Sequence, residues 1–129
     1  MAGGGVTLLR CSEDESLNAF VDALSSEERI GGELVLTALE APIRQILSNG
    51  GYNARDVLSE PSFWRTCNGG VRNKDQNYGF DALRGEYVDM LEAGIIDAAK
   101  VVKQSIVNSS SLAGTLLTAS GTIVNVREK

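Results

Sequence analysis

One long helical pattern, from about Glu28 to Ser48, determines the fold class that the sequence predicts. Apolar residues recur there near every fourth position, as they do on the buried face of an amphipathic helix. Pro42 lies inside the pattern, where it lacks a backbone N–H and crowds the carbonyl of Ala38. Because the apolar face stays in phase across the proline, one kinked helix is predicted rather than two separate helices. The apolar positions are Ile30, Leu34, Ala38, Leu39, Ile43, Ile46 and Leu47.

Shorter patterns of the same kind surround this helix. Ser26 suits a helix start, and Asn53 is expected to cap the short helix that follows it, since both side chains can accept a backbone N–H. The β-branched residues near the C-terminus predict one strand, which needs a partner that the chain does not obviously contain. The fold class predicted is all-α and multihelical with one short C-terminal β-strand, in a single domain over 1–129. The predicted segments are helices over 17–26, 53–60, 82–92 and 97–119 and the strand over 121–126.

Composition disfavours several classes of function. The 129 residues carry a formal net charge of −5 without a Lys/Arg cluster, so nucleic acid is not an expected partner. No apolar run approaches the roughly 18 residues that cross a bilayer, and the N-terminus lacks the pattern of a signal peptide, so no membrane partner is expected.

Histidine is absent, and the two cysteines, Cys11 and Cys67, lie far apart in the sequence. A disulfide framework, a thiolate or imidazole zinc site and a Ser-His or Cys-His nucleophile are therefore disfavoured. Any catalysis would therefore have to rely on carboxylates or backbone groups. Separately, two reduced cysteines fit a cytosol-like compartment.

Two short motifs allow both a structural and a functional interpretation. Asp81 and Asp97 are each expected to cap the N-terminus of a helix, although a capping aspartate keeps lone pairs that can face a ligand ribose. A two-carboxylate glycosidase pair is the other interpretation, and no further feature supports sugar binding. Gly3-Gly4-Gly5 is either a flexible terminus or a place where bare backbone approaches a phosphate or ring.

Three segments taken together resemble one known family. They are "AGGGVTLLR" (2–10), "LTALEAPIRQILSNGG" (36–51) and "NYGFDALRGEYVDMLEAGIIDAAKVVKQSIVNSSSLAGTLLTASGTIV" (77–124). In order and spacing they resemble the C-terminal half of the equatorial domain of a group I chaperonin, the GroEL type. The resemblance is weakest over about 52–76, which looks like a variable insert.

The resemblance implies a mostly helical ATP-binding domain from a double-ring ATPase that encloses non-native proteins under a GroES-type lid. It implies ATP and Mg²⁺ as cofactors of the parent protein, a ring of identical subunits, and a bacterial-type cytoplasm or, in a eukaryote, an organelle matrix. Gly3 and Gly4 match glycines packed against the nucleotide, and Asp81-Ala82-Leu83 matches a triplet near the adenine. Ile95 matches an apolar residue of the base pocket, and Asp97 matches the carboxylate that binds the ribose hydroxyls. Ala98 stands where the family usually has proline.

Some parts of the family pattern are missing from the chain. The phosphate-binding Gly-Asp-Gly-Thr-Thr loop, the aspartate that positions the hydrolytic water and the apical domain are not found in it. We therefore expect a piece of a longer protein, with no catalytic or metal-binding residues of its own, no bound nucleotide, and neither ATPase nor foldase activity alone. Its helices would lack part of their packing partner, so self-association is expected, through the strand 121–126 or the apolar faces.

Two other hypotheses remain open at this stage. One is a stand-alone, degenerate chaperonin-like helical interaction module without ATPase activity. The other is a small nucleotide-binding protein that binds ATP with half of a site.

Overall fold

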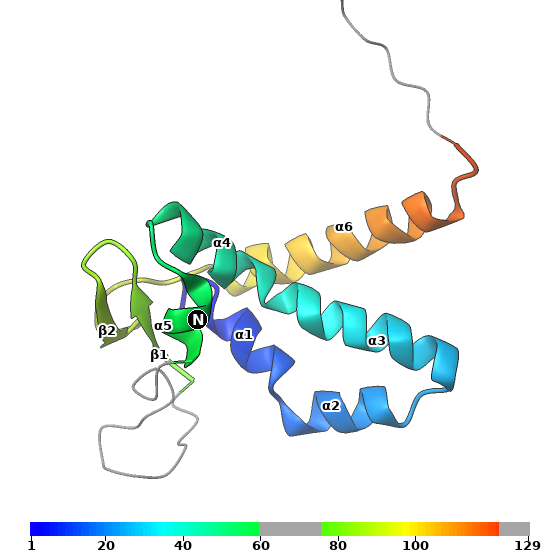
Figure 1. Cartoon of the computed structure of the whole chain (residues 1–129), viewed down its shortest axis with the longest axis horizontal. Helices are drawn as coiled ribbons and strands as arrows, with labels where there is room; N and C mark the ends of the chain where they lie inside the picture. The colour runs from blue at the N-terminus through cyan, green and yellow to red at the C-terminus, as the bar shows by residue number, and fades with distance from the viewer. Residues whose placement is uncertain (60–75, 122–129) are drawn as a thin grey trace, which may run out of the picture. The chain divides into compact units, whose positions relative to one another are not determined.

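The computed structural model describes residues 1–59 and 76–121, which divide into two units, 1–97 and the residues from Ala98 onward. Helices dominate both units, and a two-stranded sheet lies in the first (Figure 1). The first unit contains α1 (Val6–Ser12), α2 (Glu15–Asp22), α3 (Ser26–Leu39), α4 (Ala41–Asn49), α5 (Ala54–Ser59), β1 (Tyr78–Asp81) and β2 (Glu86–Asp89), and the second contains α6 (Ala99–Thr118).

Side-chain caps explain where α2 and α3 begin. The Asp14 carboxylate accepts hydrogen bonds from the backbone N–H groups of Ser16 and Leu17, at 3.0 and 3.1 Å, so α2 begins two residues earlier than predicted. Ser25 precedes α3 in a capping box, in which its backbone N–H donates to Oε2 of Glu28 at 3.4 Å, and its hydroxyl donates to the same oxygen at 2.7 Å. The predicted start at Ser26 is confirmed, although the capping residue is its neighbour.

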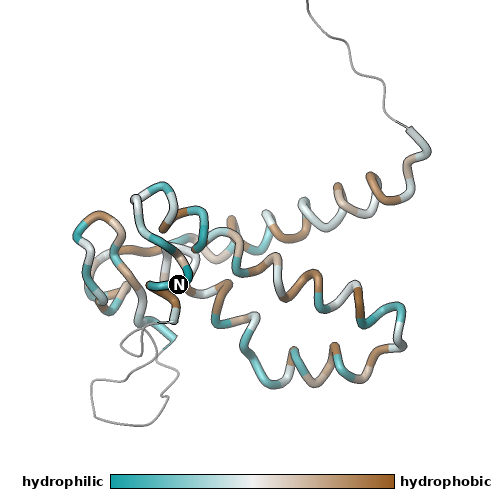
Figure 2. The backbone as a smooth tube through the Cα atoms, in the orientation of Figure 1, coloured by the Kyte–Doolittle hydropathy of each residue, from teal (hydrophilic) through white to brown (hydrophobic). Residues whose placement is uncertain are grey.

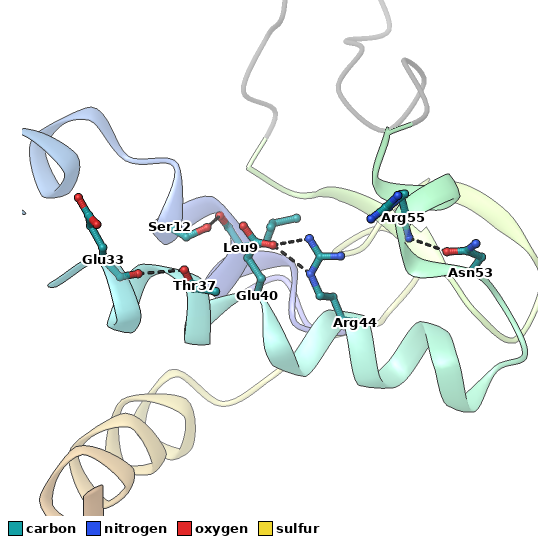
Figure 3. A network of polar contacts seen from close by, with 8 residues as sticks. All are labelled: Leu9, Ser12, Glu33, Thr37, Glu40, Arg44, Asn53 and Arg55. Atoms are coloured by element: carbon teal, nitrogen blue, oxygen red, sulfur yellow. Dashed lines mark hydrogen bonds and ion pairs between the residues drawn. The ribbon is translucent and has the colours of Figure 1, made fainter. Parts of the chain in front are cut away.

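The pattern over 28–48 forms two helices instead of the single kinked helix predicted. α3 ends at Leu39 and α4 begins at Ala41, although Glu40 between them keeps right-handed helical backbone angles. Pro42 lies in the first turn of α4, where a missing N–H costs little. Arg44 reaches back to the Glu40 carboxylate with bonds of 2.6 and 3.0 Å, which supports this first turn (Figure 3).

The predicted helix over 82–92 does not form. β1 and β2 make an antiparallel hairpin instead, with Tyr78 opposite Asp89 and Asp81 opposite Glu86. Gly85 in the connecting turn has φ of 74°, a left-handed angle that a continuous helix excludes. The helix-forming residues of this segment are thus overridden by turn geometry and by tertiary packing. The fold class remains mostly helical, with a sheet that the sequence analysis did not anticipate.

One apolar core holds the first unit together. Leu47, Met90 and Val6 are its most completely buried large side chains, and each contributes about 1.5–3 kcal/mol by leaving water. Phe80 packs edge-on between two tyrosine rings, with ring centroids 4.9 Å from each. Hydrophobic residues recur along α1, α3 and α4 at helical spacing (Figure 2). The buried cluster consists of Ala2, Val6, Leu9, Ile43, Leu47, Val57, Leu58, Phe80 and Met90.

Two further predictions concern the remaining helices. The short helix behind Asn53 is confirmed, because the Asn53 side chain accepts the N–H of Arg55 at 3.0 Å at the start of α5. The long helix predicted over 97–119 is confirmed as α6. The predicted strand over 121–126 lies outside the described residues except for Gly121, as does the part of the variable insert over 60–75. Across the residues described, no helix is both long and apolar enough to span a membrane.

Candidate functional site

The N-terminal residues pair with the segment that follows the hairpin. Gly3 donates its N–H to the carbonyl of Ile95 at 2.9 Å, and Ala2 forms an antiparallel bridge with Ile96. The N–H of Asp97 donates to the carbonyl of Met1 at 3.1 Å. These bonds bring Gly3 and Gly4 beside Ile95 and Asp97, although more than 90 residues of sequence separate the two segments.

The triple glycine forms an ordered turn into α1 rather than a flexible terminus. A Cβ atom on Gly3 would lie 3.1 Å from backbone atoms of Ile95 and Ile96, so the paired segment would have to shift by a few tenths of an ångström to admit it. Gly4 and Gly5 have φ of 65° and 78°, in the left-handed region. A Cβ on Gly5 would also meet the backbone N of Ile43 at 2.7 Å. The local geometry therefore favours glycine at all three positions, and most strongly at Gly5.

Asp97 does not cap a helix, contrary to the prediction. α6 begins at Ala99 after Ala98, and no side chain caps it. The pairing of Asp97 with Met1 explains this, because both main-chain groups of the aspartate bond to the N-terminal residue. Its carboxylate is exposed and makes no hydrogen bond or ion pair within the described part of the chain. The acceptor oxygens of Asp97 are consequently available to a ligand.

Asp81 does not cap a helix either, because no helix follows it. Its Oδ1 accepts the N–H groups of Leu83 and Arg84, at 2.9 and 3.3 Å, and so closes the hairpin turn. The residue is 8% exposed, and its Oδ2 lies 3.7 Å from Nε of Arg84. Asp81 makes the bonds of a cap, but it makes them within a turn. One carboxylate oxygen remains outside these turn bonds.

The other two residues of the triplet differ in exposure. Ala82 is half-buried, and its methyl lies 3.2 Å from where a Cβ of Gly50 would be. Leu83 is 94% exposed at the tip of the hairpin. Ala82 and Ile95 both pack against the buried apolar cluster, so the hairpin turn and the paired segment rest on the same core. Three predicted site residues, Gly3, Ile95 and Asp97, thus lie in one backbone pairing, Gly4 follows directly after it, and the other three lie on the hairpin turn.

The described residues fit part of an adenine nucleotide. The exposed Asp97 carboxylate has the oxygens to accept hydrogen bonds from two neighbouring hydroxyl groups, and Ile95 beside it offers an apolar surface. Among residues 1–59 and 76–121, no three carboxylate or thiol side chains gather closely enough to hold a metal ion. The described residues thus offer an exposed acceptor and an apolar contact surface next to each other.

Sequence reasoning missed Gly79 of β1 and Met90, whose side chain lies between the hairpin and the glycine turn. Met90 is 1% exposed, and a Cβ on Gly79 would lie within 3.0 Å of its Cγ. A glycine between Tyr78 and Phe80 is the one local signal of such a close approach.

Two comparisons with known proteins gave matches that cover nearly the whole chain. Residues 1–127 match the model of the TCP-1/cpn60 chaperonin family. A solved structure described as the crystal structure of a group III chaperonin in the open state matches with a TM-score of 0.79 and 28% sequence identity. The match covers 95% of this chain and 24% of that one, so the chain spans about a quarter of its length.

Proposed function

Because this chain belongs to the TCP-1/cpn60 chaperonin family, we propose that it forms part of the ATP-binding equatorial domain of a GroEL-type, group I chaperonin. The complete protein would be a ring-forming ATPase that encloses non-native proteins and takes a GroES-type lid. The match over residues 1–127 and the structural likeness over 95% of the chain support the chaperonin assignment. The group I assignment rests on the resemblance of the three sequence segments.

The pairing between Gly3 and Ile95 is the observation that carries the proposal. It holds the exposed Asp97 carboxylate next to a turn of glycines and beside an apolar residue. In the proposed site Asp97 accepts hydrogen bonds from the two ribose hydroxyls, and Ile95 contacts one face of the base. We assign Gly3 and Gly4 to the wall of the site beside Asp97, where the lack of side chains lets residues 95–96 and Met90 pack closely against the glycine turn.

The hairpin turn would supply the remaining contacts of the adenosine pocket. Asp81 Oδ1 is used by the turn, and we assign the second oxygen, Oδ2, to the polar edge of the base. Ala82 and Leu83 add apolar surface at this end of the pocket. The seven residues hold and orient the nucleoside, and we assign none of them a catalytic role.

Phosphoryl transfer requires phosphate-binding groups and metal ligands in addition to a nucleoside site. ATP and Mg²⁺ would supply the chemistry once the phosphate loop and metal ligands of the complete protein are present. The sequence contains no Gly-Asp-Gly-Thr-Thr loop, and the described residues include no cluster of three side chains that could hold a metal ion. We propose that the chain alone is inactive as an ATPase and as a foldase. The complete protein would act in a bacterial-type cytoplasm or in an organelle matrix.

A second candidate function is a helical interaction module without ATPase activity. Large apolar side chains on the solvent side of α3 and α6 favour this candidate, because exposed apolar surface is usually buried by association. Such a module would bind a partner, or a second copy of itself, and no nucleotide. The exposed residues are Ile30, Leu34 and Val35 on α3, and Val101, Ile106, Val107, Leu112, Leu116 and Leu117 on α6.

Nucleotide titration of the complete gene product separates the two candidates. We expect ATP to bind to the wild type. Asp97→Ala should weaken the free energy of ATP binding by about 1.5–3 kcal/mol, because hydrogen bonds to a charged group are lost. Asp56→Ala, an exposed aspartate on α5, serves as the matched control and should bind as the wild type does. A gene product that binds no ATP, or an Asp97→Ala variant with unchanged affinity, would reject the proposed nucleotide site.

The lid distinguishes group I from the coarser family assignment. If the proposal is correct, a GroES-type co-chaperonin should associate with the ATP-loaded complete protein in sedimentation or light scattering. Failure to associate, with ATP binding intact, would leave a chaperonin of another group.

A further inference from the structure

Met90 lies where three segments of the first unit meet. It is the first residue after β2, and its side chain is 1% exposed. Its N–H donates to the carbonyl of Asn77 at 2.8 Å, which closes the open end of the hairpin. Its carbonyl accepts the N–H of Ile95 at 2.8 Å, so the main chain of Met90 also fixes the turn that leads to Ile95 and Asp97.

The side chain of Met90 extends across two glycines that are far apart in the sequence. Its Cγ and Sδ lie 3.0 and 3.1 Å from where a Cβ of Gly79 would be, against β1. Its terminal Cε lies 2.7 Å from the corresponding position of Gly4. The side chain therefore fills the space that both glycines leave open, and it touches the hairpin and the glycine turn at once.

Methionine suits this position for a physical reason. Its unbranched chain can run between two backbone surfaces, and its polarisable thioether fills irregular gaps. A shorter side chain would reach Gly79 but leave Gly4 without a contact. The glycine turn and the hairpin could then move relative to each other, since packed interiors transmit such changes in spacing.

We propose that Met90 is a positioning residue for adenine nucleotide, which sets the distance between the glycine turn paired with Asp97 and the hairpin turn that carries Asp81. This inference rests on the proposed function, because it concerns the same pocket. Met90 makes no contact with the nucleotide itself and acts through Gly4 and Gly79.

The test compares nucleotide affinity with stability in the complete gene product. ADP is titrated into the wild type and into Met90→Ala, Met90→Val and Met90→Leu, at a temperature where each variant is folded. We expect Met90→Ala to raise the Kd for ADP about tenfold, within the range for residues that couple sites without touching ligand. Met90→Val should raise the Kd several-fold, and Met90→Leu, which keeps most of the volume but has no atom equivalent to the Cε that reaches Gly4, should also raise it.

Val21→Ala is the matched control for a purely structural effect. Val21 is 5% exposed and packs against Gly32 of α3, outside the apolar cluster that supports the site. This variant should lower the unfolding temperature while leaving the Kd for ADP unchanged. If Met90→Ala gives no folded protein, Met90→Val provides the same comparison.

The outcomes distinguish this inference from the proposed function. A wild-type protein that binds no ADP overturns the proposed function and this inference with it. A wild type that binds ADP, together with Met90→Ala and Met90→Val variants of unchanged affinity, overturns the positioning role alone. Loss of affinity in the Met90 variants but not in Val21→Ala supports it.

Discussion

Replacing Gly3 by alanine tests the backbone pairing on which the candidate site depends. The new methyl would lie 3.1 Å from the carbonyl carbon and oxygen of Ile95 and from the carbonyl carbon of Ile96. All three are backbone atoms, so no side-chain rotation can relieve the contact. Gly3 does not have a left-handed φ, and the effect therefore comes from this crowding and not from backbone strain.

The loss of stability expected for Gly3→Ala can be estimated from the backbone contacts that the new methyl group would displace. Overpacking at a buried position costs about 1–3 kcal/mol, and each main-chain hydrogen bond that lengthens adds about 0.5–1.5 kcal/mol. We expect Gly3→Ala to lower the free energy of unfolding by about 2–4 kcal/mol, through the crowding and the Gly3–Ile95 bond. With a urea slope of about 1–3 kcal/mol/M, the midpoint should fall by roughly 1 M or more.

Urea denaturation followed by far-UV circular dichroism measures this change. Gly31→Ala is the matched control, because Gly31 lies in α3 with nothing within 4 Å of its Cβ position. Alanine there should stabilise the helix by about 0.5–1 kcal/mol, which is the opposite sign. A Gly3→Ala midpoint equal to that of the wild type would refute the pairing of residues 2–3 with 95–96.

Two further predictions concern single carboxylates. Asp81→Ala removes the acceptor for two backbone N–H groups in the hairpin turn and should lower the free energy of unfolding by about 1–3 kcal/mol in urea denaturation. Asp81→Asn keeps an acceptor oxygen and should lower the free energy of unfolding by less. Equal losses of stability in the two variants would contradict the role of Asp81 in the turn. Hydrogen bonds from the Ser25 hydroxyl and then its N–H lower the pKa of Glu28. Because the pKa of Glu28 is lower in the folded state than in the unfolded state, its carboxylate stabilises the fold at pH values above the unfolded pKa, and this stabilisation is lost as the pH falls through the folded pKa. Ser25→Ala should therefore make the free energy of unfolding less sensitive to acid below about pH 4.3. A pH profile unchanged by Ser25→Ala would contradict this assignment.

Local patterns in the sequence predicted most of the helices. The apolar period over 28–48 located α3 and α4, and the small and apolar residues after Asp97 located α6. Periodicity succeeds here because each helix forms its hydrogen bonds within its own segment. The break between α3 and α4 was missed because the backbone remains helical through Glu40 and the apolar face stays in phase.

The hairpin could not be predicted from its own residues. Ala82, Leu83 and Arg84 favour a helix, but Gly79 packs against Val6 and Met90, and these contacts are made only in the folded chain. The capping role expected of Asp97 failed for a similar reason, since its main chain pairs with Met1.

The residues of the candidate site could not be predicted from local patterns such as periodicity. Its residues came from the family resemblance, while the structure supplied the pairing that joins Gly3 to Ile95. Met90 carries no motif and was identified only from the contacts that it makes.

A structure of the complete gene product with bound ADP would test the central claim most directly. The account predicts that the ribose hydroxyls lie within hydrogen-bond distance of the Asp97 carboxylate, with the base beside Ile95 and Ala82. ADP bound elsewhere, or no ADP bound at saturating concentration, would contradict it.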